Sequence, residues 1–179
     1  MTKSSPQKIA IIGCAGSGKT TLALQLKDKL KLPLYHLDQY YWKPGWQRGD
    51  SEVFEKVHTD LCHQDAWIIE GSYYKFLAER ATCADLIIFL DVPRGICIWR
   101  VLKRSITNFG KSIPGAPQGC KEQLFTLKFL EFLQWIWGFK HRSRPIILQT
   151  LQQFTEKEIV VVKSPQEALT LLDGHRNPL

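Results

Sequence analysis

The sequence lacks any apolar stretch long enough to cross a lipid bilayer. Its longest purely apolar runs, such as Leu86–Leu90, are far shorter than the roughly 20 residues that a membrane-spanning helix needs. The start of the chain, Met1–Lys8, is short and polar, and the apolar run after it leads into a glycine loop and not into a small-residue cleavage site. We therefore expect a cytoplasmic protein with no membrane segment.

Paired motifs for disulfides or metals are also missing. The five cysteines are scattered and form no CxxC pair, and their odd number argues against a disulfide framework. His58, Cys62 and His63 lie close together, but a second ligand pair at a spacing suitable for zinc is lacking. We read these three residues as ordinary positions on one helix.

The chain is basic, but its net charge does not identify a ligand. The chain has a formal charge of +7, and many of its cations fall in Arg94–Lys111 and Lys140–Arg144. A basic surface attracts polyanions, but nucleotide binding also requires local positive charge. The sequence contains no recognisable nucleic-acid motif such as a zinc finger. Charge alone therefore leaves both nucleotide and nucleic acid open as ligands.

The strongest motif is G-x-x-x-x-G-K-[ST], present as Gly13–Thr20. A predicted strand precedes it and a predicted helix follows it, which is the context that a phosphate-binding loop requires. Glycines let backbone N–H groups surround phosphate oxygens, and the helix N-terminus favours the same anion. Lys19 is expected to reach the β- and γ-phosphates, and the Thr20 hydroxyl to ligate Mg²⁺. The residues predicted to bind ATP here are Gly13, Ala15, Gly16, Ser17, Gly18, Lys19, Thr20 and Thr21.

The apolar segments predict an α/β fold. Five short apolar runs are typical of strands buried on both faces: Lys8–Ile12, Leu34–Leu37, Trp67–Glu70, Asp85–Asp91 and Glu158–Val162. Periodicity and capping signals predict the helices Thr20–Leu30, Ser51–His63 (capped by Ser51), Lys75–Thr82, Pro93–Thr107, Lys121–Phe139, Ile146–Phe154 after a break at Pro145, and Pro165–Leu172 capped by Ser164. This alternation predicts one domain over residues 1–179, with a parallel sheet covered by helices on both faces.

Acidic residues follow three of the predicted strands. Asp38 lies at the carboxyl end of the second strand, where open α/β sheets bind ligands. Its carboxylate could accept a hydroxyl proton, hold a magnesium-bound water, or cap a turn. Glu70 ends the third strand, and we favour a role in holding Mg²⁺ through water over a solvated turn. Asp91, after the fourth strand, is better placed to cap the next helix.

Arginines flank a glycine-rich segment. Arg100 and Arg104 are one helical turn apart, and an anion between them would turn their mutual repulsion into attraction. They precede the loop Asn108–Gly119, so they could be carried by a lid that closes over the transferred phosphate. Arg142 and Arg144, beside Pro145, could close from the far side.

Four of the six tryptophans fall into two groups. Trp135 and Trp137 lie on an aromatic-rich helix at spacings that favour the hydrophobic core over a ligand. Trp42 and Trp46 lie in the loop beside Asp38, where an aromatic ring could stack on a base, although a purely structural role is the more ordinary interpretation.

Several segments together resemble the adenylate-kinase-like P-loop proteins, and more narrowly the group called DNA topology modulation proteins. The resemblance covers nearly the whole chain. It is carried by the glycine loop, Leu37–Trp46, Trp67–Tyr73, Ile88–Arg94, Arg100 with Arg104, the Gly119–Cys120 loop, Trp135–Trp137 and Lys163–Pro165.

The resemblance implies a nucleoside-monophosphate-kinase-like fold with sheet order 2-3-1-4-5 and a lid at about residues 105–121. It also implies that Lys163 and Pro165 pack near the adenine, that the lid arginines meet phosphates, and that Asp38 falls where shikimate-kinase-like relatives keep a substrate-site aspartate. The chain departs from true adenylate kinases at Glu70–Tyr74, where they carry Asp-Gly-x-Pro-Arg, and it lacks their Thr-Gly-Asp motif. These departures argue against AMP as the phosphate acceptor.

Two functional hypotheses follow. The first is a kinase that uses ATP and Mg²⁺ to phosphorylate a small acceptor such as a nucleoside, a nucleotide or another hydroxyl compound. Its catalytic residues would be Lys19, Asp38, Arg100, Arg104 and Arg144, with Thr20 and Glu70 at the metal. The second is an ATP-dependent protein that binds DNA or a partner and affects DNA topology. We favour the kinase.

Overall fold

The centre of the molecule is a five-stranded parallel sheet, seen in a computed structural model that describes residues 5–174. The strands are β1 (Lys8–Gly13), β2 (Leu34–His36), β5 (Trp67–Glu70), β6 (Leu86–Leu90) and β7 (Glu158–Val162). Their order across the sheet is β2-β5-β1-β6-β7, which confirms the predicted order 2-3-1-4-5. The outermost parts of the predicted domain, residues 1–4 and 175–179, lie outside the described residues.

The three central strands are buried on both faces. Every residue of Ile9–Ile12 and of Trp67–Ile69 has no exposed surface, and β6 is equally enclosed. Polar groups of a strand are satisfied by its neighbours in the sheet, so these runs of branched apolar residues can be dry on both sides. Such a sheet requires a helical layer above and another below.

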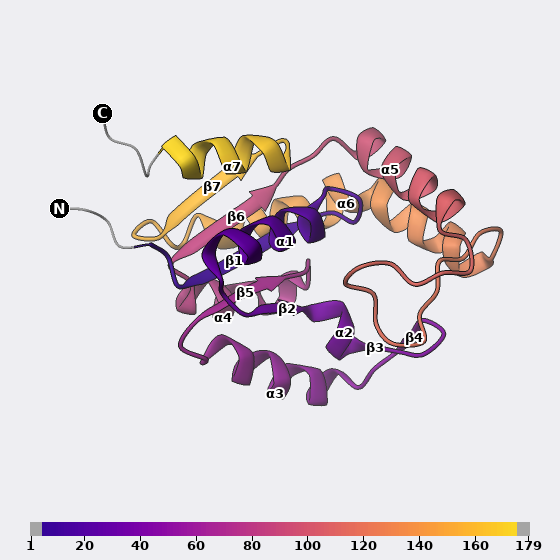
Figure 1. Cartoon of the computed structure of the whole chain (residues 1–179), viewed down its shortest axis with the longest axis horizontal. Coiled ribbons are helices and arrows are strands. Elements are labelled where there is room, and N and C mark those ends of the chain that lie inside the picture. Colours follow the sequence, from indigo (N-terminus) through magenta and orange to yellow (C-terminus); the bar gives the residue numbers. More distant parts are fainter. Residues whose placement is uncertain (1–4, 175–179) are drawn as a thin grey trace.

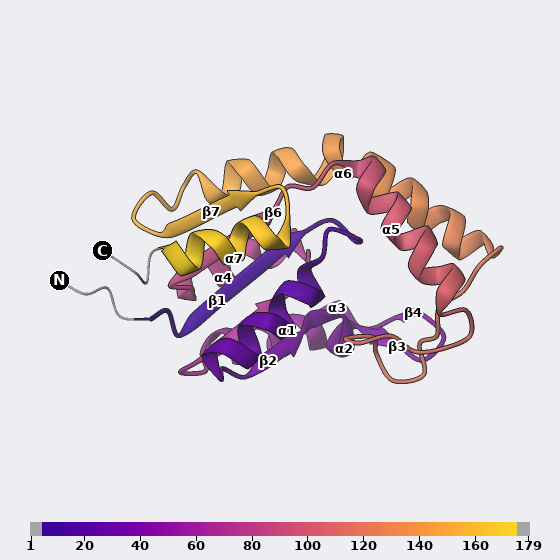
Figure 2. The same cartoon turned by 45° about the horizontal axis from the view of Figure 1, so that its top comes forward.

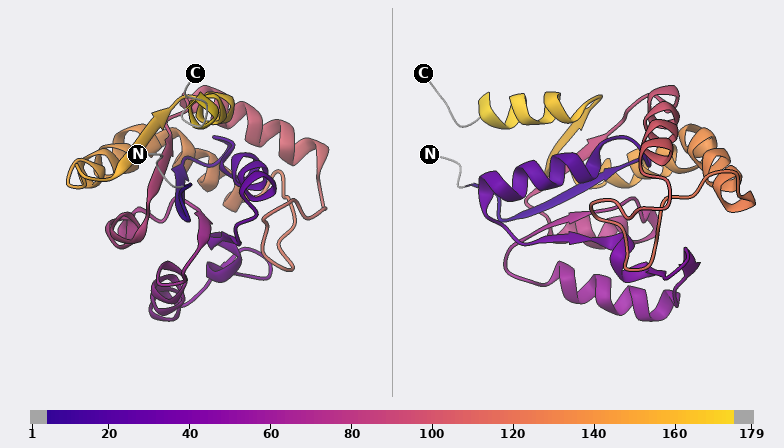
Figure 3. Two further views of the ribbon diagram at one scale, coloured as in Figure 1. Left: turned by 60° about the vertical axis from the view of Figure 1, so that its left-hand side comes forward. Right: turned by 45° about the vertical axis from the view of Figure 1, so that its right-hand side comes forward.

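The helices supply these two layers (Figure 3, left). On one face lie α1 (Lys19–Leu30) and α7 (Pro165–Gly174), and on the other lie α3 (Ser51–Cys62), α4 (Leu77–Cys83) and the later part of α6 (Leu127–Leu151). A single turn of 3-10 helix, η1 (Tyr74–Phe76), precedes α4. Within residues 5–174, no helix combines the length and the apolar character needed to cross a membrane.

Two further elements lie at the carboxyl end of the sheet, where the strands point in Figure 1. The short helix α2 (Leu37–Tyr41) follows β2 directly, and a small hairpin of β3 (Trp42–Lys43) and β4 (Gln47–Arg48) follows α2. Helix α5 (Arg94–Thr107) projects from the end of β6, and the first part of α6 runs beside it (Figure 2). Neither α2 nor the hairpin was expected from the sequence.

The structure corrects the prediction for α6 at both ends. The helix begins at Leu127 and not at Lys121, because Thr126 caps it by accepting a hydrogen bond from the Phe129 N–H at 3.1 Å. It continues through Pro145 to Leu151 without the expected break, although it bends (Figure 2). An interior proline costs about 3 kcal/mol, but the buried Ile147 and Leu151 beyond it each contribute roughly 1.5–3 kcal/mol by leaving water.

Of the helix caps predicted at Ser51, Asp91 and Ser164, only the one at Ser164 is confirmed. Asp50, and not Ser51, caps α3, since its carboxylate accepts hydrogen bonds from the N–H groups of Glu52 and Val53 at 2.8 and 3.1 Å. The prediction for Ser164 is confirmed, because its hydroxyl accepts a hydrogen bond from the Glu167 N–H at 3.1 Å. Asp91 does not cap α5. The residue at that position is Pro93, which precedes the first helical residue and was predicted to be inside the helix.

Candidate active site

The phosphate-binding motif forms a loop between β1 and α1. Gly18 is the residue that precedes α1 and adopts a left-handed conformation (φ 98°), so the loop turns directly into the helix N-terminus. The Ser17 N–H donates to the carbonyl of Cys14 at 3.2 Å, which closes the loop on itself. Lys19 Nζ donates to the same carbonyl at 3.0 Å. The lysine thus lies across the loop, next to the N–H groups that would bind an anion.

The loop is packed tightly against helix α5. Gly16 has a φ of +77°, and a β-carbon at this position would lie 2.3 Å from the carbonyl oxygen of Cys97 on α5. The Cys14 thiol in turn hydrogen bonds to the Cys97 thiol. Arg100, one turn further along α5, donates to the carbonyl of Ser17 at 3.2 Å. Glycine is therefore required at position 16 both for its backbone conformation and for this close approach.

A carboxylate from the neighbouring strand meets the loop. The Thr20 hydroxyl donates to Oε1 of Glu70 at 3.1 Å, and His36 Nδ1 lies 2.7 Å from the same oxygen. His36 and Glu70 are register partners at the ends of β2 and β5, so the sheet itself brings them together. The Glu70 side chain is buried.

The electrostatics of this cluster keep Glu70 charged. Burial alone would raise the pKa of Glu70, but the hydrogen bond from His36 and the positive charge of Lys19 outweigh it and hold this pKa below its usual value. The Thr20 hydrogen bond acts in the same direction. A buried acid that remains ionised beside a phosphate-binding loop has the chemistry of a metal-supporting carboxylate.

These groups fit a magnesium ion of the kind used by P-loop proteins. Mg²⁺ prefers hard oxygen ligands and usually retains several waters, so a single protein hydroxyl and a carboxylate suffice when phosphates supply the rest. Thr20 would contribute its hydroxyl directly, and Glu70 would hold a metal-bound water. Within residues 5–174 no group of three or more His, Cys, Asp or Glu side chains forms a self-sufficient metal site.

A second carboxylate, Asp38, lies on α2 beyond Glu70. The Tyr73 hydroxyl donates to Asp38 Oδ1 at 2.7 Å. Asp38 is an exposed residue, but protein atoms surround its carboxylate on most sides. This partial loss of solvent and the nearby charge of Glu70 raise the pKa of Asp38 above its ordinary value. The two carboxylates thus have opposite pKa shifts, which is a pattern found where acids have different roles.

The segment after β5 is held by a fully buried arginine. Arg80 on α4 donates to the carbonyls of Gly71, Ser72 and Tyr73 at 2.9, 2.9 and 3.1 Å. The Ser72 hydroxyl donates to the Gly13 carbonyl. The guanidinium therefore fixes the backbone that carries Tyr73, and Ser72 ties that backbone to the phosphate-binding loop.

The connection between α5 and α6, residues 108–126, lies over this region (Figure 3, right). A β-carbon at Gly115 would lie 3.0 Å from His36 Nδ1 and 3.1 Å from Thr20 Cγ2, so this part of the loop touches both sides of the Glu70 cluster. Further along, Trp46 Nε1 donates to the Lys121 carbonyl at 2.8 Å. The predicted lid range of 105–121 thus includes the last turn of α5 and most of this loop.

The two predicted lid arginines have different environments. Arg100 reaches the phosphate-binding loop, as described above, whereas Arg104 lies 3.1 Å from the buried carboxylate of Glu122 in the loop. The Ser105 hydroxyl donates to the same carboxylate. Arg104 Nε is buried with no hydrogen-bond partner among the described residues. We expected a bound anion between Arg100 and Arg104. In the structure, the carboxylate of Glu122 fills this role for Arg104.

Arg144 binds Asp91 and not the loop. Its Nε lies 2.8 and 3.0 Å from the two carboxylate oxygens of Asp91, and its Nη2 lies 2.7 Å from one of them. This pairing explains why Asp91 does not cap α5, and the hydrogen bonds that Arg144 donates to Asp91 raise the pKa of Arg144. The predicted partner Arg142 is exposed and donates to the Gln134 carbonyl at 3.3 Å.

The remaining predicted ATP contacts lie on the other side of the loop. A β-carbon at Gly18 would lie 2.6 Å from Pro165 Cγ and 3.8 Å from Arg100 Nη1, so Pro165 and Arg100 flank the start of α1. Lys163 is exposed and lines a cavity of about 450 Å³ together with Cys14 of the loop and Asp91, Val92, Pro93, Arg94, Gly95, Ile136, Phe139, Lys140 and Arg144. Thr21 is exposed on α1.

The tryptophans only partly match their predicted roles. Trp135 packs against the core, as expected. The prediction for Trp137 is wrong, since its side chain is 56% exposed and the Arg94 guanidinium lies 3.8 Å from the centre of its ring. Trp42 and Trp46 contact each other edge to face, with ring centres 5.9 Å apart.

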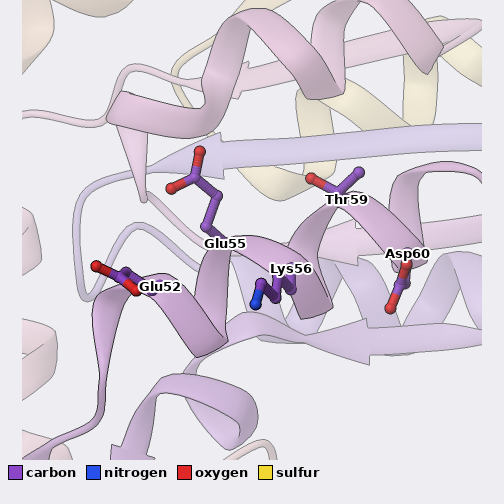
Figure 4. A pocket seen from close by; sticks show the side chains of 5 residues that line it. All are labelled: Glu52, Glu55, Lys56, Thr59 and Asp60. Carbon is purple, nitrogen blue, oxygen red and sulfur yellow. The ribbon is translucent and has the colours of Figure 1, made fainter.

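A second hollow of about 420 Å³ lies on the outer side of α3 and is lined by Glu52, Glu55, Lys56, Thr59 and Asp60 (Figure 4). All five residues belong to one solvated helix, and none of the predicted site residues is among them. We therefore regard the carboxyl end of the sheet as the candidate site.

Sequence reasoning missed four residues that build this site: His36, Tyr73, Arg80 and Glu122. His36 could have been found, because the predicted strand order places the ends of the second and third strands side by side. Tyr73 lies only three residues past Glu70, but its direction depends on the backbone that Arg80 holds. The roles of Arg80 and Glu122 left no signal in the sequence, since each depends on a long-range contact.

Comparisons with known proteins agree on the fold. No protein-family model matches the chain. The uncharacterized protein YqaC of Bacillus subtilis (strain 168) is 27% identical over 109 residues, and the chain spans 61% of the length of that relative. Shikimate kinase from Acinetobacter baumannii, solved in complex with shikimate, matches with a TM-score of 0.59 at 15% identity over 96% of both chains. Shikimate kinase from Bacteroides thetaiotaomicron matches with a TM-score of 0.53 at 16% identity over 94% of this chain and 99% of that one.

The structural likenesses show that the chain has the P-loop kinase fold, with a five-stranded parallel sheet between two layers of helices.

Proposed function

We propose that the protein is a phosphotransferase that uses ATP and Mg²⁺ to phosphorylate the hydroxyl group of a small molecule. The observation that carries this proposal is that two carboxylates with opposite pKa shifts, Glu70 and Asp38, lie beside the phosphate-binding loop. Glu70 accepts a hydrogen bond from Thr20 of the loop, whereas Asp38, which also interacts with the charges of Glu70 and Lys19, accepts its hydrogen bond from Tyr73. This separates a donor side from an acceptor side.

On the donor side, the loop amides and Lys19 would bind the β- and γ-phosphates of ATP. Thr20 and Glu70 would hold Mg²⁺, which neutralises phosphate charge when bound. Arg100, which already donates to the Ser17 carbonyl of the loop, would turn to the phosphates, and Pro165 with Lys163 would pack near the adenine. Arg144 would join only if its pair with Asp91 opened, so its catalytic role has the least support.

On the acceptor side, Asp38 would orient the hydroxyl and accept its proton. A raised pKa brings the carboxylate closer to the proton affinity that a general base needs near neutral pH. Tyr73 would hold Asp38 in place through its 2.7 Å hydrogen bond. Phosphoryl transfer relies on positioning and electrostatics, so these few groups would be sufficient.

We further propose that residues 108–126, with the end of α5, act as the lid of a single catalytic domain. Its contact with Thr20 and His36 at Gly115 would let the loop exclude water from the transferred phosphate. Opening of the Arg104–Glu122 pair would release a guanidinium toward that phosphate.

The direct test is ADP formation from Mg²⁺ and ATP against a panel of nucleosides, nucleotides, polyols and hydroxy acids. We expect one class to stimulate ADP release, Lys19→Met to abolish it, and Asp38→Asn to lower kcat by about 100-fold or more while ATP still binds. Asp65→Asn changes an exposed acid between α3 and β5 and should behave like the unaltered chain. ATP binding without stimulation by any acceptor would count decisively against the proposal.

The resemblance of Leu37–Trp46 and the other quoted segments supports placing the chain in the DNA topology modulation group. We propose that the chain belongs to this group, which is a subset of the proteins with the P-loop kinase fold. The name of that group describes an effect on DNA and does not define a chemical step.

One observation favours a second function, ATP-dependent binding of DNA. Residues 94–144 contain ten Lys and Arg but two Asp and Glu, for a net charge of +8, while the rest of the chain carries 14 basic and 15 acidic residues. The same segment exposes four large aromatic side chains: Trp99, Phe109, Phe125 and Trp137. Cations combined with exposed aromatic rings are what single-stranded nucleic acids bind.

The second function is tested by titrating a labelled DNA single strand at several salt concentrations, with ATP, with ADP and without nucleotide. Specific use of this surface predicts binding that persists at physiological salt and weakens in the double variant Trp99→Ala with Trp137→Ala. Complete loss of binding at physiological salt would make the positive charge incidental.

A further inference from the structure

We infer that the acceptor carries neither a phosphate nor a carboxylate, and is an uncharged or positively charged hydroxyl compound such as a nucleoside or an amino alcohol. This inference rests on the proposed function and narrows its substrate class. It follows from the charges that surround Asp38.

The charged side chains that act most strongly on Asp38 are one acid, Glu70, and two bases, Lys19 and His36. Lys19 belongs to the phosphate-binding loop, where ATP would use its charge. His36 Nδ1 lies 2.7 Å from Glu70 and is already engaged by it. Once ATP is bound, an acceptor beside Asp38 therefore meets two carboxylates and no unengaged cation from this set.

Arginine is the residue that proteins most often use to bind carboxylate and phosphate groups, because its planar fork matches their oxygens. The described residues include seven arginines, and six of them already have partners within the protein. They are Arg80 with the carbonyls of Gly71–Tyr73, Arg94 with Trp137, Arg100 with Ser17, Arg104 with Glu122, Arg142 with Gln134 and Arg144 with Asp91. Of these six, Arg100, Arg104 and Arg144 would serve the phosphates of ATP under the function proposed above.

Arg80 is the one of these six that binds the backbone of Tyr73, the partner of Asp38, and its side chain has no exposed surface. It cannot touch a ligand without unfolding the backbone after β5.

The seventh arginine, Arg48, lies on the hairpin with Lys43. Both side chains are exposed, and the carboxylate that interacts with Lys43 is Asp50, at the start of α3. Both cations are therefore exposed to water, and Lys43 already has an acidic neighbour. An anionic group placed next to Asp38 would lose its water and meet like charge, an arrangement that proteins use to reject the wrong ligand.

The experiment compares acceptors that differ by one anionic group. Each nucleoside is paired with its 5′-monophosphate, and each polyol with the corresponding sugar acid. Turnover is measured as ADP formed with Mg²⁺ and ATP, and binding is measured by calorimetry with ADP and Mg²⁺ present. We expect the uncharged member of a pair to have a kcat/KM at least about tenfold higher and a correspondingly lower dissociation constant.

Asp38→Asn isolates the electrostatic contribution. Because this variant is expected to turn over slowly, it is tested by binding: the preference for the uncharged member should shrink several-fold, whereas Asp65→Asn should leave it unchanged. An equal or better fit of the anionic member, in turnover or in binding, would overturn the inference while leaving a kinase in place. Turnover of no acceptor, despite binding of the uncharged ones, would overturn the kinase function and retain the binding preference.

Discussion

Arg80 shows how single residues prepare the site from a distance. It is fully enclosed, and burial lowers the pKa of its guanidinium to about 10, which still leaves it charged at neutral pH. Burying an unpaired charge is costly, and here three backbone carbonyls compensate for the lost water. The arginine thereby fixes the segment that carries Tyr73, although it touches no ligand itself.

The neighbouring His58 gives a prediction about pH and stability. Its side chain is fully buried against Glu79, and burial together with the charge of Arg80 lowers the pKa of His58 from 6.5 to about 4. The unfolded chain therefore binds a proton at this residue between about pH 6.5 and pH 4, and the folded chain does not. We expect the free energy of unfolding to decrease as pH falls through this window, by up to about 3 kcal/mol.

This dependence is measured by urea unfolding at several pH values from about 7 down to about 4. His58→Gln should lower stability overall and flatten the pH dependence, while His141→Gln, at an exposed histidine on α6, should preserve it. An unchanged slope in the His58 variant would mean that another group is responsible.

At the scale of elements, the P-loop and α5 behave as one packed unit because Gly16 has no side chain. Gly16→Ala would force a β-carbon to within 2.3 Å of the Cys97 carbonyl at a φ of +77°. We expect a loss of roughly 1–3 kcal/mol in stability and a clear loss of ATP affinity. Thermal unfolding with and without Mg²⁺ and ATP measures both.

Gly95→Ala is the matched control, because a β-carbon at Gly95 would meet nothing within 4 Å and alanine favours the helix. It should leave stability unchanged or raise it. If both variants behaved alike, the close approach of the loop to α5 would not be the cause.

The start of α6 offers a second test at this scale. Thr126→Ala removes the hydroxyl that caps the helix and should cost about 1 kcal/mol. Gln123→Ala, inside the range where the sequence predicted helix, should change stability by less than about 0.5 kcal/mol. The urea midpoints of unfolding of the two variants are compared, and the variant with the larger loss shows where the helix begins. A larger effect at Gln123 than at Thr126 would support the earlier start.

Elements were predictable where the signal is local. The strands and α1 follow from short apolar runs and from the glycine motif, and their positions are confirmed. The continuation of α6 through Pro145 was not predictable, because it depends on buried contacts of Ile147 and Leu151 that exist only in the folded molecule. Asp91 illustrates the same limit, since a distant Arg144 takes the carboxylate that the local pattern assigns to a cap.

At the scale of the whole molecule, strand order could be predicted only through family resemblance, because apolar runs do not specify their neighbours. Once that order is known, the meeting of Glu70, His36 and Thr20 at one sheet edge follows from the register. The placement of residues 108–126 over that edge does not follow from sequence, because a loop without regular structure has no periodicity to interpret.

The proposed lid predicts a change in protease sensitivity. Lys111 and Lys121 are exposed within this loop. We expect Mg²⁺ and ATP to slow tryptic cleavage after both lysines by several-fold, because a loop held over bound phosphates opens less often. Mass spectrometry of short digests identifies the sites. Lys19→Met should show no protection, and equal protection in that variant would exclude the bound nucleotide as the cause.

The two partners of the acceptor side are attached to the molecule in different ways. Tyr73 is anchored to the core by Arg80, whereas Asp38 sits on a helix of five residues that leads into a small hairpin. Apart from the buried Leu37, the residues of α2 and the hairpin are exposed or half-buried, so substitutions there can accumulate without disturbing the sheet or the phosphate-binding loop. A lineage built on this scaffold could change its acceptor through that one short stretch and keep its phosphate donor, so divergence of substrate choice should be concentrated in residues 38–48.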